Sequence, residues 1–164
     1  MEVKTAFVSG ANRGIGLEMV KQLANLPMPP EIIFATYRDK KSIKNLEQIQ
    51  NEVKGTEIIL IQMDVSNSTD IKAAGKIVSD KLMDKGLNLL MNNAGIYKEE
   101  KLSEITEENL LNHFSTNAMG PILLFQPNFK PFRPHNSFLF MNLLRASIKL
   151  SVERDINSSK CTAP

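Results

Sequence analysis

The chain has 164 residues, of which 42% are hydrophobic and 23% charged, and its formal net charge is +2. This composition is typical of a globular protein, and the length suffices for one domain with a hydrophobic core. The charge is too small, and the lysines and arginines too scattered, to indicate a nucleic-acid partner. A single cysteine, Cys161, excludes an internal disulfide framework and favours the cytoplasm. No apolar run reaches the ~20 residues of a membrane-spanning helix, so no membrane association is expected.

Apolar segments and amphipathic segments alternate along the first 95 residues. Strands are expected at residues 3–9, 31–37, 57–63 and 87–92. Helical spacing of apolar residues follows the first three, at Ile15, Met19, Leu23 and Leu26, then at Ile43, Leu46, Ile49 and Val53, and then at Ile71, Ala74, Ile77, Val78 and Leu82. Strands that are apolar on both faces and alternate with helices form parallel sheets covered on both sides. The sequence therefore predicts an α/β fold with a Rossmann-type doubly wound parallel sheet.

The pattern weakens in the last quarter of the chain. A helix is expected after Thr106, with apolar positions at Leu110, Leu111, Phe114 and Ala118. Three prolines then follow between residues 127 and 134, and an interior proline costs a helix about 3 kcal/mol. Residues 137–144 could form a fifth strand. We therefore expect a nucleotide-binding domain over residues 1–125 and a degenerate or irregular segment of the same domain over residues 126–164.

The stretch SGANRGIG, residues 9–16, follows the first predicted strand and is called the glycine loop below. Gly10 permits a sharp turn, and Gly14 and Gly16 leave space where the backbone approaches a phosphate or another segment. The helix that starts near Ile15 points its N-terminal amides at the same place. A purely structural turn remains the alternative for the glycines alone.

The residues after the second strand bear on the choice of nucleotide. Sites for NAD place an acidic residue there, which binds the ribose 2′-hydroxyl. Here Arg38 comes first, and Arg13 in the glycine loop adds a second cation; an arginine pairs well with a 2′-phosphate. These residues favour NADP(H) over NAD(H). Asp39 is the counter-argument, because a shift of one residue would make it the ribose-binding acid.

Four motifs together resemble the short-chain dehydrogenase/reductase family, in particular its carbonyl-reductase-like and sniffer-like members. They are SGANRGIG, MDV at residues 63–65, NNAG at residues 92–95 and STNAMGP at residues 115–121. By this resemblance Asp64 and Val65 contact the adenine, NNAG lies beside the adenosine ribose, and Asn117 is the active-site asparagine. The implied cofactor-binding residues are Gly10, Asn12, Arg13, Gly14, Ile15, Gly16, Arg38, Asp64, Val65, Asn93, Ala94 and Gly95. Taken singly, Asp64 could be a strand-end cap and Asn117 a satisfied polar group on a helix.

The catalytic half of the family pattern is missing from this chain. Members use a serine and a Tyr-x-x-x-Lys pair, in which the lysine lowers the pKa of the tyrosine that transfers the proton. Both tyrosines, Tyr37 and Tyr97, precede Asn117. The segment INSSK, residues 156–160, resembles the family's YxxSK with Ile156 in the place of tyrosine, which leaves Lys160 as the candidate catalytic lysine.

The resemblance implies an NADP(H)-dependent oxidoreductase that reduces a small carbonyl or oxidises an alcohol, with this chain catalytically impaired. The alternative is a nucleotide-binding pseudoenzyme or truncated isoform without turnover, because family subunits are longer than this chain. Dimerisation in the family's manner is doubtful for the same reason. His113 and His135 are the only histidines and lack partners at ligand spacing, so no metal site is expected.

Overall fold

The computed structural model describes residues 3–83, 85–126, 139–142 and 150–151. Its centre is a parallel sheet of five strands in the order β3-β2-β1-β4-β6. These strands are β1 (Thr5–Val8), β2 (Ile32–Tyr37), β3 (Glu57–Gln62), β4 (Leu89–Asn92) and β6 (Leu139–Asn142). A separate short pairing joins β5 (Glu100–Lys101) to β7 (Leu150–Ser151). The chain order reverses direction between β1 and β4, which is the switch point of a doubly wound sheet.

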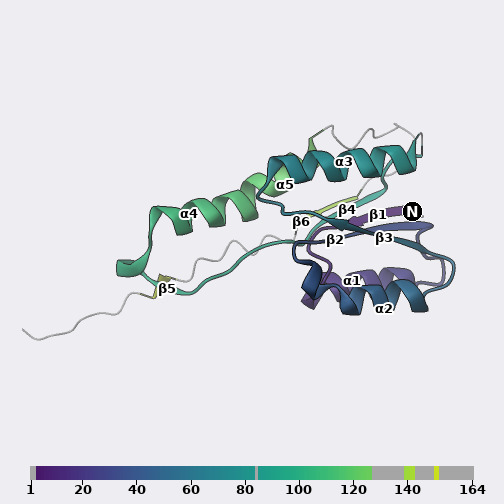
Figure 1. The fold of residues 1–164 in the computed structure, drawn as a ribbon, viewed down its shortest axis with the longest axis horizontal. Coiled ribbons are helices and arrows are strands. Elements are labelled where there is room, and N and C mark those ends of the chain that lie inside the picture. Colours follow the sequence, from purple (N-terminus) through teal and green to yellow (C-terminus); the bar gives the residue numbers. More distant parts are fainter. Residues whose placement is uncertain (1–2, 84, 127–138, 143–149, 152–164) are drawn as a thin grey trace, which may run out of the picture.

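Helices cover both faces of the sheet (Figure 1). Helices α1 (Gly14–Ala24) and α2 (Lys44–Glu52) lie on one face, and α3 (Ser68–Leu82) and α5 (Gly120–Phe125) lie on the other. Two 3₁₀ turns, η1 (Lys40–Ser42) and η2 (Leu102–Glu104), precede α2 and α4 (Glu107–Phe114). A π-helical turn, η3 (Ser115–Met119), joins α4 to α5. The predicted doubly wound α/β architecture is confirmed.

Two hydrophobic clusters, one on each face of the sheet, form the core. On the side of α1 and α2, strand residues such as Ala6, Val8 and Ile33 pack with Val20 and Leu46. On the opposite side the members are Phe7, Ile32, Phe34, Ile61, Met63, Val65, Ile71, Ala74, Val78, Leu82, Leu87, Leu90 and Leu124. Because successive strand residues alternate between the two clusters, apolar side chains are needed at every position, as the continuous apolar runs predict.

The first helix buries its small residues more completely than the large apolar residues that predict its buried face, of which Met19 and Leu23 are only partly buried against the core. Its buried residues are Gly16, Val20 and Ala24, whereas Ile15 is 49% exposed. The cause is Gly16, on which a Cβ atom would collide with the Gly10 carbonyl oxygen and the Asn93 side-chain amide. This close approach turns the small residues of α1 toward the sheet and leaves Ile15 at the rim.

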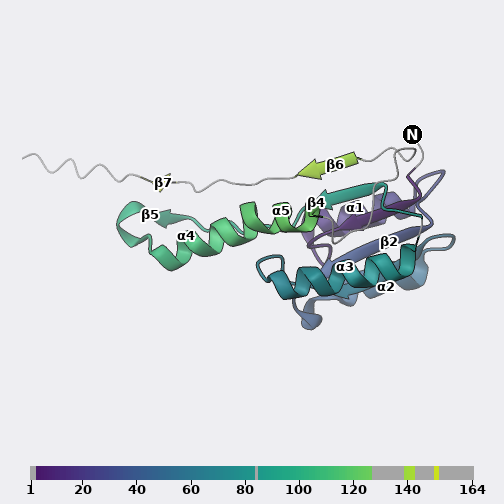
Figure 2. The same cartoon turned by 90° about the horizontal axis from the view of Figure 1, so that it is seen from above.

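Helix α4 also departs from the prediction. Its N-cap is Thr106, as expected, and its side chain accepts a hydrogen bond from the Asn109 amide at 3.2 Å. However, Leu110, Leu111 and Phe114 are all exposed in the described structure. These residues are exposed because α4 continues α5 outward beyond the end of the sheet (Figures 1 and 2).

The expected fifth strand is present as β6, which pairs with β4 from Leu89↔Leu139 to Asn92↔Asn142. The remaining expectations for residues 126–164, namely an irregular segment and the INSSK motif with Lys160, lie outside the described residues except for Gln126 and β7.

Candidate functional site

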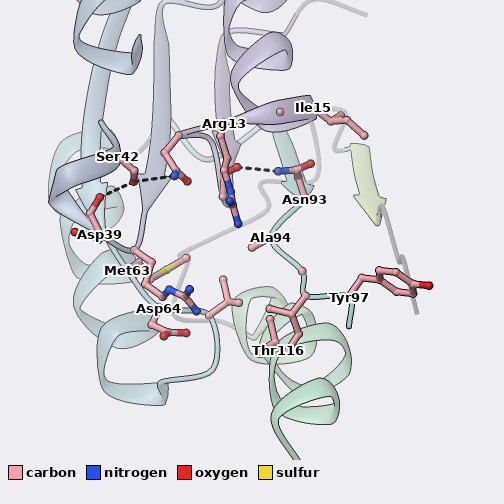
Figure 3. A pocket seen from close by; sticks show the side chains of 17 residues that line it. Arg13, Ile15, Asp39, Ser42, Met63, Asp64, Asn93, Ala94, Tyr97 and Thr116 are labelled. Atoms are coloured by element: carbon pink, nitrogen blue, oxygen red, sulfur yellow. Dashed lines mark hydrogen bonds between the residues drawn. The ribbon is translucent and has the colours of Figure 1, made fainter. Parts of the chain in front are cut away.

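A cavity of about 850 Å³ opens at the carboxyl ends of the central strands (Figure 3). Its walls are the segments that directly follow β1, β2, β3 and β4. The lining residues are Gly10, Asn12, Arg13, Gly14, Ile15, Arg38, Asp39, Ser42, Met63, Asp64, Val65, Asn93, Ala94, Gly95, Ile96, Tyr97 and Thr116. Open α/β sheets bind ligands in this crevice because the loops after the strands diverge at the switch point. The volume is within the range of small-molecule and cofactor sites.

The glycine loop forms the wall of the cavity nearest to α1. Gly10 and Gly14 have φ of +64° and +57°, a region that glycine enters without the penalty of a side chain. A Cβ atom on Gly10 would also lie 2.9 Å from Ala94 Cα. Gly16 does not line the cavity, and its role is the close packing of α1 described above. The exposed Gly14 begins α1, so the positive end of that helix borders the cavity.

Side-chain hydrogen bonds join the glycine loop to the end of β4. The side-chain nitrogen Nδ2 of Asn93 donates to the backbone carbonyl oxygens of Ser9 and Gly10, both at 2.9 Å. The Ser9 hydroxyl accepts from the backbone amides of Asn93 and Ala94, both at 3.0 Å. These four bonds fix two walls of the cavity relative to each other.

The second wall carries Arg38, Asp39 and Ser42. Arg38 and Arg13 both line the cavity from exposed positions, and Figure 3 shows Arg13 extending from the glycine loop toward it. The Asp39 carboxylate accepts a hydrogen bond from the Lys41 amide at 2.9 Å and so caps η1. Two guanidinium groups therefore border this part of the cavity, which suits a phosphate.

The third wall follows β3. The Asp64 carboxylate accepts hydrogen bonds from the Ser66 amide at 2.8 Å and from the Ser66 hydroxyl at 2.7 Å, both through Oδ1. The Asp64 backbone amide donates to Asp70 at 2.9 Å, which orients this turn. The strand-end cap that the sequence left open is thus present, and Asp64 lines the cavity as well. Val65 and Met63 are buried and provide an apolar surface beside it.

Asn117 lies in the π-helical turn and does not line the described cavity. Its Oδ1 accepts from the Ile96 amide and its Nδ2 donates to the Ile96 carbonyl, both at 2.9 Å. Asn117 is 8% exposed, and its side chain bonds to both the amide and the carbonyl of Ile96, as the backbone of a neighbouring strand would. The asparagine thereby holds the segment after β4, with Ile96 and Tyr97, in place. These bonds fit the satisfied polar group that the sequence allowed as an alternative, and the role of Asn117 as the active-site asparagine stays a prediction.

The structure brings together eleven of the fourteen residues predicted for the site. Gly16 and Asn117 are buried and do not line the cavity, and Lys160 lies outside the described residues. Sequence reasoning missed Ser9, Ser42, Met63, Ile96, Tyr97 and Thr116. Ser9 carried a signal as the first residue of the glycine motif, whereas Ser42 and Thr116 reach the site only through the fold. In Figure 3 the hydroxyl end of Tyr97 points away from the other labelled side chains.

The described part of the chain shows neither a membrane-spanning helix nor a cluster of metal ligands. No helix in it has the length and apolar character that crossing a membrane requires. Among the same residues, no group of three or more His, Cys, Asp or Glu side chains is arranged to hold a metal ion.

Known proteins resemble this chain in both sequence and structure. The family model for short chain dehydrogenases matches residues 4–136. The chain is 27% identical over 145 residues to short chain dehydrogenase mdpC of Emericella nidulans, covering 87% of this chain and 52% of that protein. It is 29% identical over 121 residues to human retinol dehydrogenase 8, covering 74% of this chain and 37% of that protein.

Two solved carbonyl reductases share the fold. NADPH-bound carbonyl reductase from chicken fatty liver superposes with a TM-score of 0.73 at 37% identity, covering 79% of this chain and 48% of that one. Carbonyl reductase Sniffer of D. melanogaster gives 0.71 at 32% identity, covering 77% and 51%. The chain thus spans about half the length of these reductases and of mdpC. With the family model matched over most of its length, the chain belongs to the short-chain dehydrogenase family of oxidoreductases.

Proposed function

We propose that the cavity at the carboxyl ends of the strands binds NADP(H). The observation that carries this proposal is the common cavity itself, which joins the glycine loop, Arg38, Asp64 and the NNAG segment. The glycine loop and the N-terminus of α1 offer backbone amides to the pyrophosphate. Asp64 and Val65 lie where the adenine would sit by family resemblance, and residues 93–95 lie beside its ribose.

The preference for NADP(H) over NAD(H) rests on the second wall. Arg13 and Arg38 border the cavity from two different segments and can pair with a 2′-phosphate. Asp39, the residue that would favour NAD(H), is engaged as the cap of η1. The NADPH bound in the chicken carbonyl reductase supports the same choice.

Calorimetry or nicotinamide fluorescence with NADPH and NADH tests this proposal. We expect the unmodified chain to bind NADPH more tightly than NADH. Arg38→Ala should weaken NADPH about tenfold, because an arginine–phosphate pair is lost, and leave NADH within about twofold. Lys72→Ala, which removes one exposed charge from α3, is the matched control. Equal or tighter binding of NADH, or an unchanged NADPH affinity in Arg38→Ala, would contradict the arginine assignment.

The reaction that we propose on the basis of family membership is the interconversion of a small carbonyl compound and an alcohol. Bound NADPH would supply a hydride to the carbonyl carbon, so a protein group must deliver a proton to the oxygen. No Tyr-x-x-x-Lys follows Asn117 in this chain, where the family's motif would lie, and Ile156, at the place of the tyrosine, carries no titratable proton. The Tyr97 hydroxyl points away from the cavity (Figure 3). We therefore propose that this chain binds the cofactor with impaired turnover.

Oxidation of NADPH with a simple aldehyde or quinone, followed at 340 nm, tests this second part of the proposal. We expect cofactor binding without consumption above the rate of free NADPH, which is the behaviour of a nucleotide-binding pseudoenzyme. Steady consumption by the chain alone would show that another group delivers the proton.

We propose the nicotinamide dinucleotide as the partner of this chain, with a small carbonyl compound as substrate in full-length relatives. We propose that this chain does not dimerise in the family's manner, and light scattering at several concentrations would test it. The cytoplasm is the proposed compartment, supported by the single cysteine.

A further inference from the structure

A side-chain hydrogen bond links the glycine loop to the η1 turn across the rim of the cavity (Figure 3). The Asn12 amide nitrogen donates to the Ser42 hydroxyl oxygen at 2.9 Å, although the two residues are 30 positions apart. Both residues line the cavity and both are only partly exposed. No family motif quoted above contains Ser42, so its place at this rim is a finding of the tertiary structure.

The local structure of η1 orients the Ser42 hydroxyl. This hydroxyl donates to the Asp39 carbonyl oxygen at 2.6 Å, so its lone pairs remain available to Asn12. The Ser42 backbone amide donates to the same carbonyl at 3.0 Å. Asp39 in turn caps the turn through Lys41. Ser42 is thus held in a fixed position before any ligand binds, which is the condition for a residue that orients others.

Two further hydrogen bonds join these walls in the described residues, and they involve the buried residues Ala11 and Thr36. The Ala11 amide donates to the Thr36 carbonyl at 2.7 Å, and the Gly10 amide donates to the Thr36 hydroxyl at 3.1 Å. Those bonds belong to the packing of β1 against β2. The Asn12–Ser42 bond joins positions farther from the two strands along the chain. Ser42 follows Arg38 in the second wall, and Asn12 directly precedes Arg13 in the glycine loop.

We propose that Ser42 is a positioning residue that determines cofactor specificity by fixing the separation of Arg13 and Arg38. Arg13 directly follows Asn12, and Arg38 precedes the capped turn that holds Ser42. Two guanidinium groups bind one phosphate together only when their backbones are held at the right spacing. The inference rests on the proposed NADP(H) function and adds that Ser42 acts through the two arginines and not by contact with the phosphate.

The test compares the dissociation constants of NADPH and NADH for the unmodified chain, Ser42→Ala and Ser42→Thr. Ser42→Ala removes the link and should weaken NADPH about fivefold while leaving NADH within about twofold. Ser42→Thr retains a hydroxyl and should restore most of the NADPH affinity. Ser103→Ala, in the exposed turn η2 away from the cavity, is the matched control and should change neither constant.

A double-mutant cycle with Arg38→Ala separates positioning from general loosening. If Ser42 acts through Arg38, then adding Ser42→Ala to the Arg38→Ala variant should change NADPH affinity by less than about twofold. Adenosine 2′,5′-bisphosphate and 5′-AMP serve as smaller probes, and only the bisphosphate should lose affinity in Ser42→Ala.

The outcomes distinguish this inference from the function on which it rests. If the unmodified chain binds NADPH and Ser42→Ala keeps its full selectivity, only the role of Ser42 is overturned. Equal weakening of NADPH and NADH, or full additivity with Arg38→Ala, overturns it in the same way. If the unmodified chain binds neither cofactor, both the proposed function and this inference are wrong.

Discussion

At the scale of single residues, the glycines of the glycine loop have separate tasks. Gly14 needs its left-handed backbone, at φ +57°, but a Cβ atom there would meet nothing within 4 Å. Gly16 has ordinary helical backbone but no space, because the Gly10 carbonyl and the Asn93 side chain occupy the place of a Cβ atom. Asn93 is also the residue that joins β4 to the glycine loop. The packing at Gly16 and the geometry of the cavity therefore depend on the same contact.

We predict that Gly14→Ala and Gly16→Ala differ in severity. Gly14→Ala should lower the free energy of unfolding by about 1 kcal/mol, the cost of a left-handed alanine. Gly16→Ala must displace α1 or Asn93 and should cost about 3 kcal/mol and abolish NADPH binding. Chemical denaturation and cofactor fluorescence measure the two effects. A Gly16→Ala variant as stable as Gly14→Ala would contradict the packing argument.

At the scale of elements, apolar periodicity predicted which segments are helical better than it predicted what they bury. Helix α3 buries Ile71, Ala74, Val78 and Leu82, as its spacing indicates, because it lies along the sheet. The prediction was wrong for Ile77, which is 45% exposed. Helix α4 has equally apolar residues, yet they are exposed because α4 extends beyond the sheet (Figure 2). Periodicity reports an apolar face and does not report whether another element covers it.

We predict a matching contrast in stability between these two helices. Leu82→Ala should lower the free energy of unfolding by about 3 kcal/mol, since Leu82 is 1% exposed within a packed cluster. Phe114→Ala should change it by less than about 0.5 kcal/mol, since Phe114 is 60% exposed. Urea unfolding of both variants provides the measurement. A large loss in Phe114→Ala would mean that this face of α4 is covered in solution.

At the scale of the whole molecule, the cavity draws its walls from segments that follow four parallel strands. A ligand that contacts all four walls binds the folded state and has no equivalent site in the unfolded chain. Its binding free energy is therefore added to the stability of the entire domain.

We predict that NADPH raises the melting temperature of the chain. At a free concentration of one hundred times Kd the stabilisation should be about 2.7 kcal/mol, which corresponds to a shift of roughly 5–10 °C for a domain of this size. Arg38→Ala at the same NADPH concentration should show a smaller shift, and 5′-AMP provides the control ligand. An unchanged melting temperature at saturating NADPH would count against binding in this cavity.

The sequence by itself determined the order of strands and helices, the parallel sheet and the family. It could do so because continuous apolar runs and the motifs SGANRGIG and NNAG are local patterns that each depend on neighbouring residues. It also indicated most of the cavity lining, since the loops after parallel strands must meet at one edge of the sheet.

Only the tertiary structure decided which residues from distant segments meet. The pairing of Asn117 with Ile96 and that of Asn12 with Ser42 join positions 21 and 30 residues apart. The buried face of α1 and the exposed face of α4 were likewise decided by what lies beside each helix. These features depend on contacts between elements, and a pattern read along one segment carries no information about the surface that another segment brings to it.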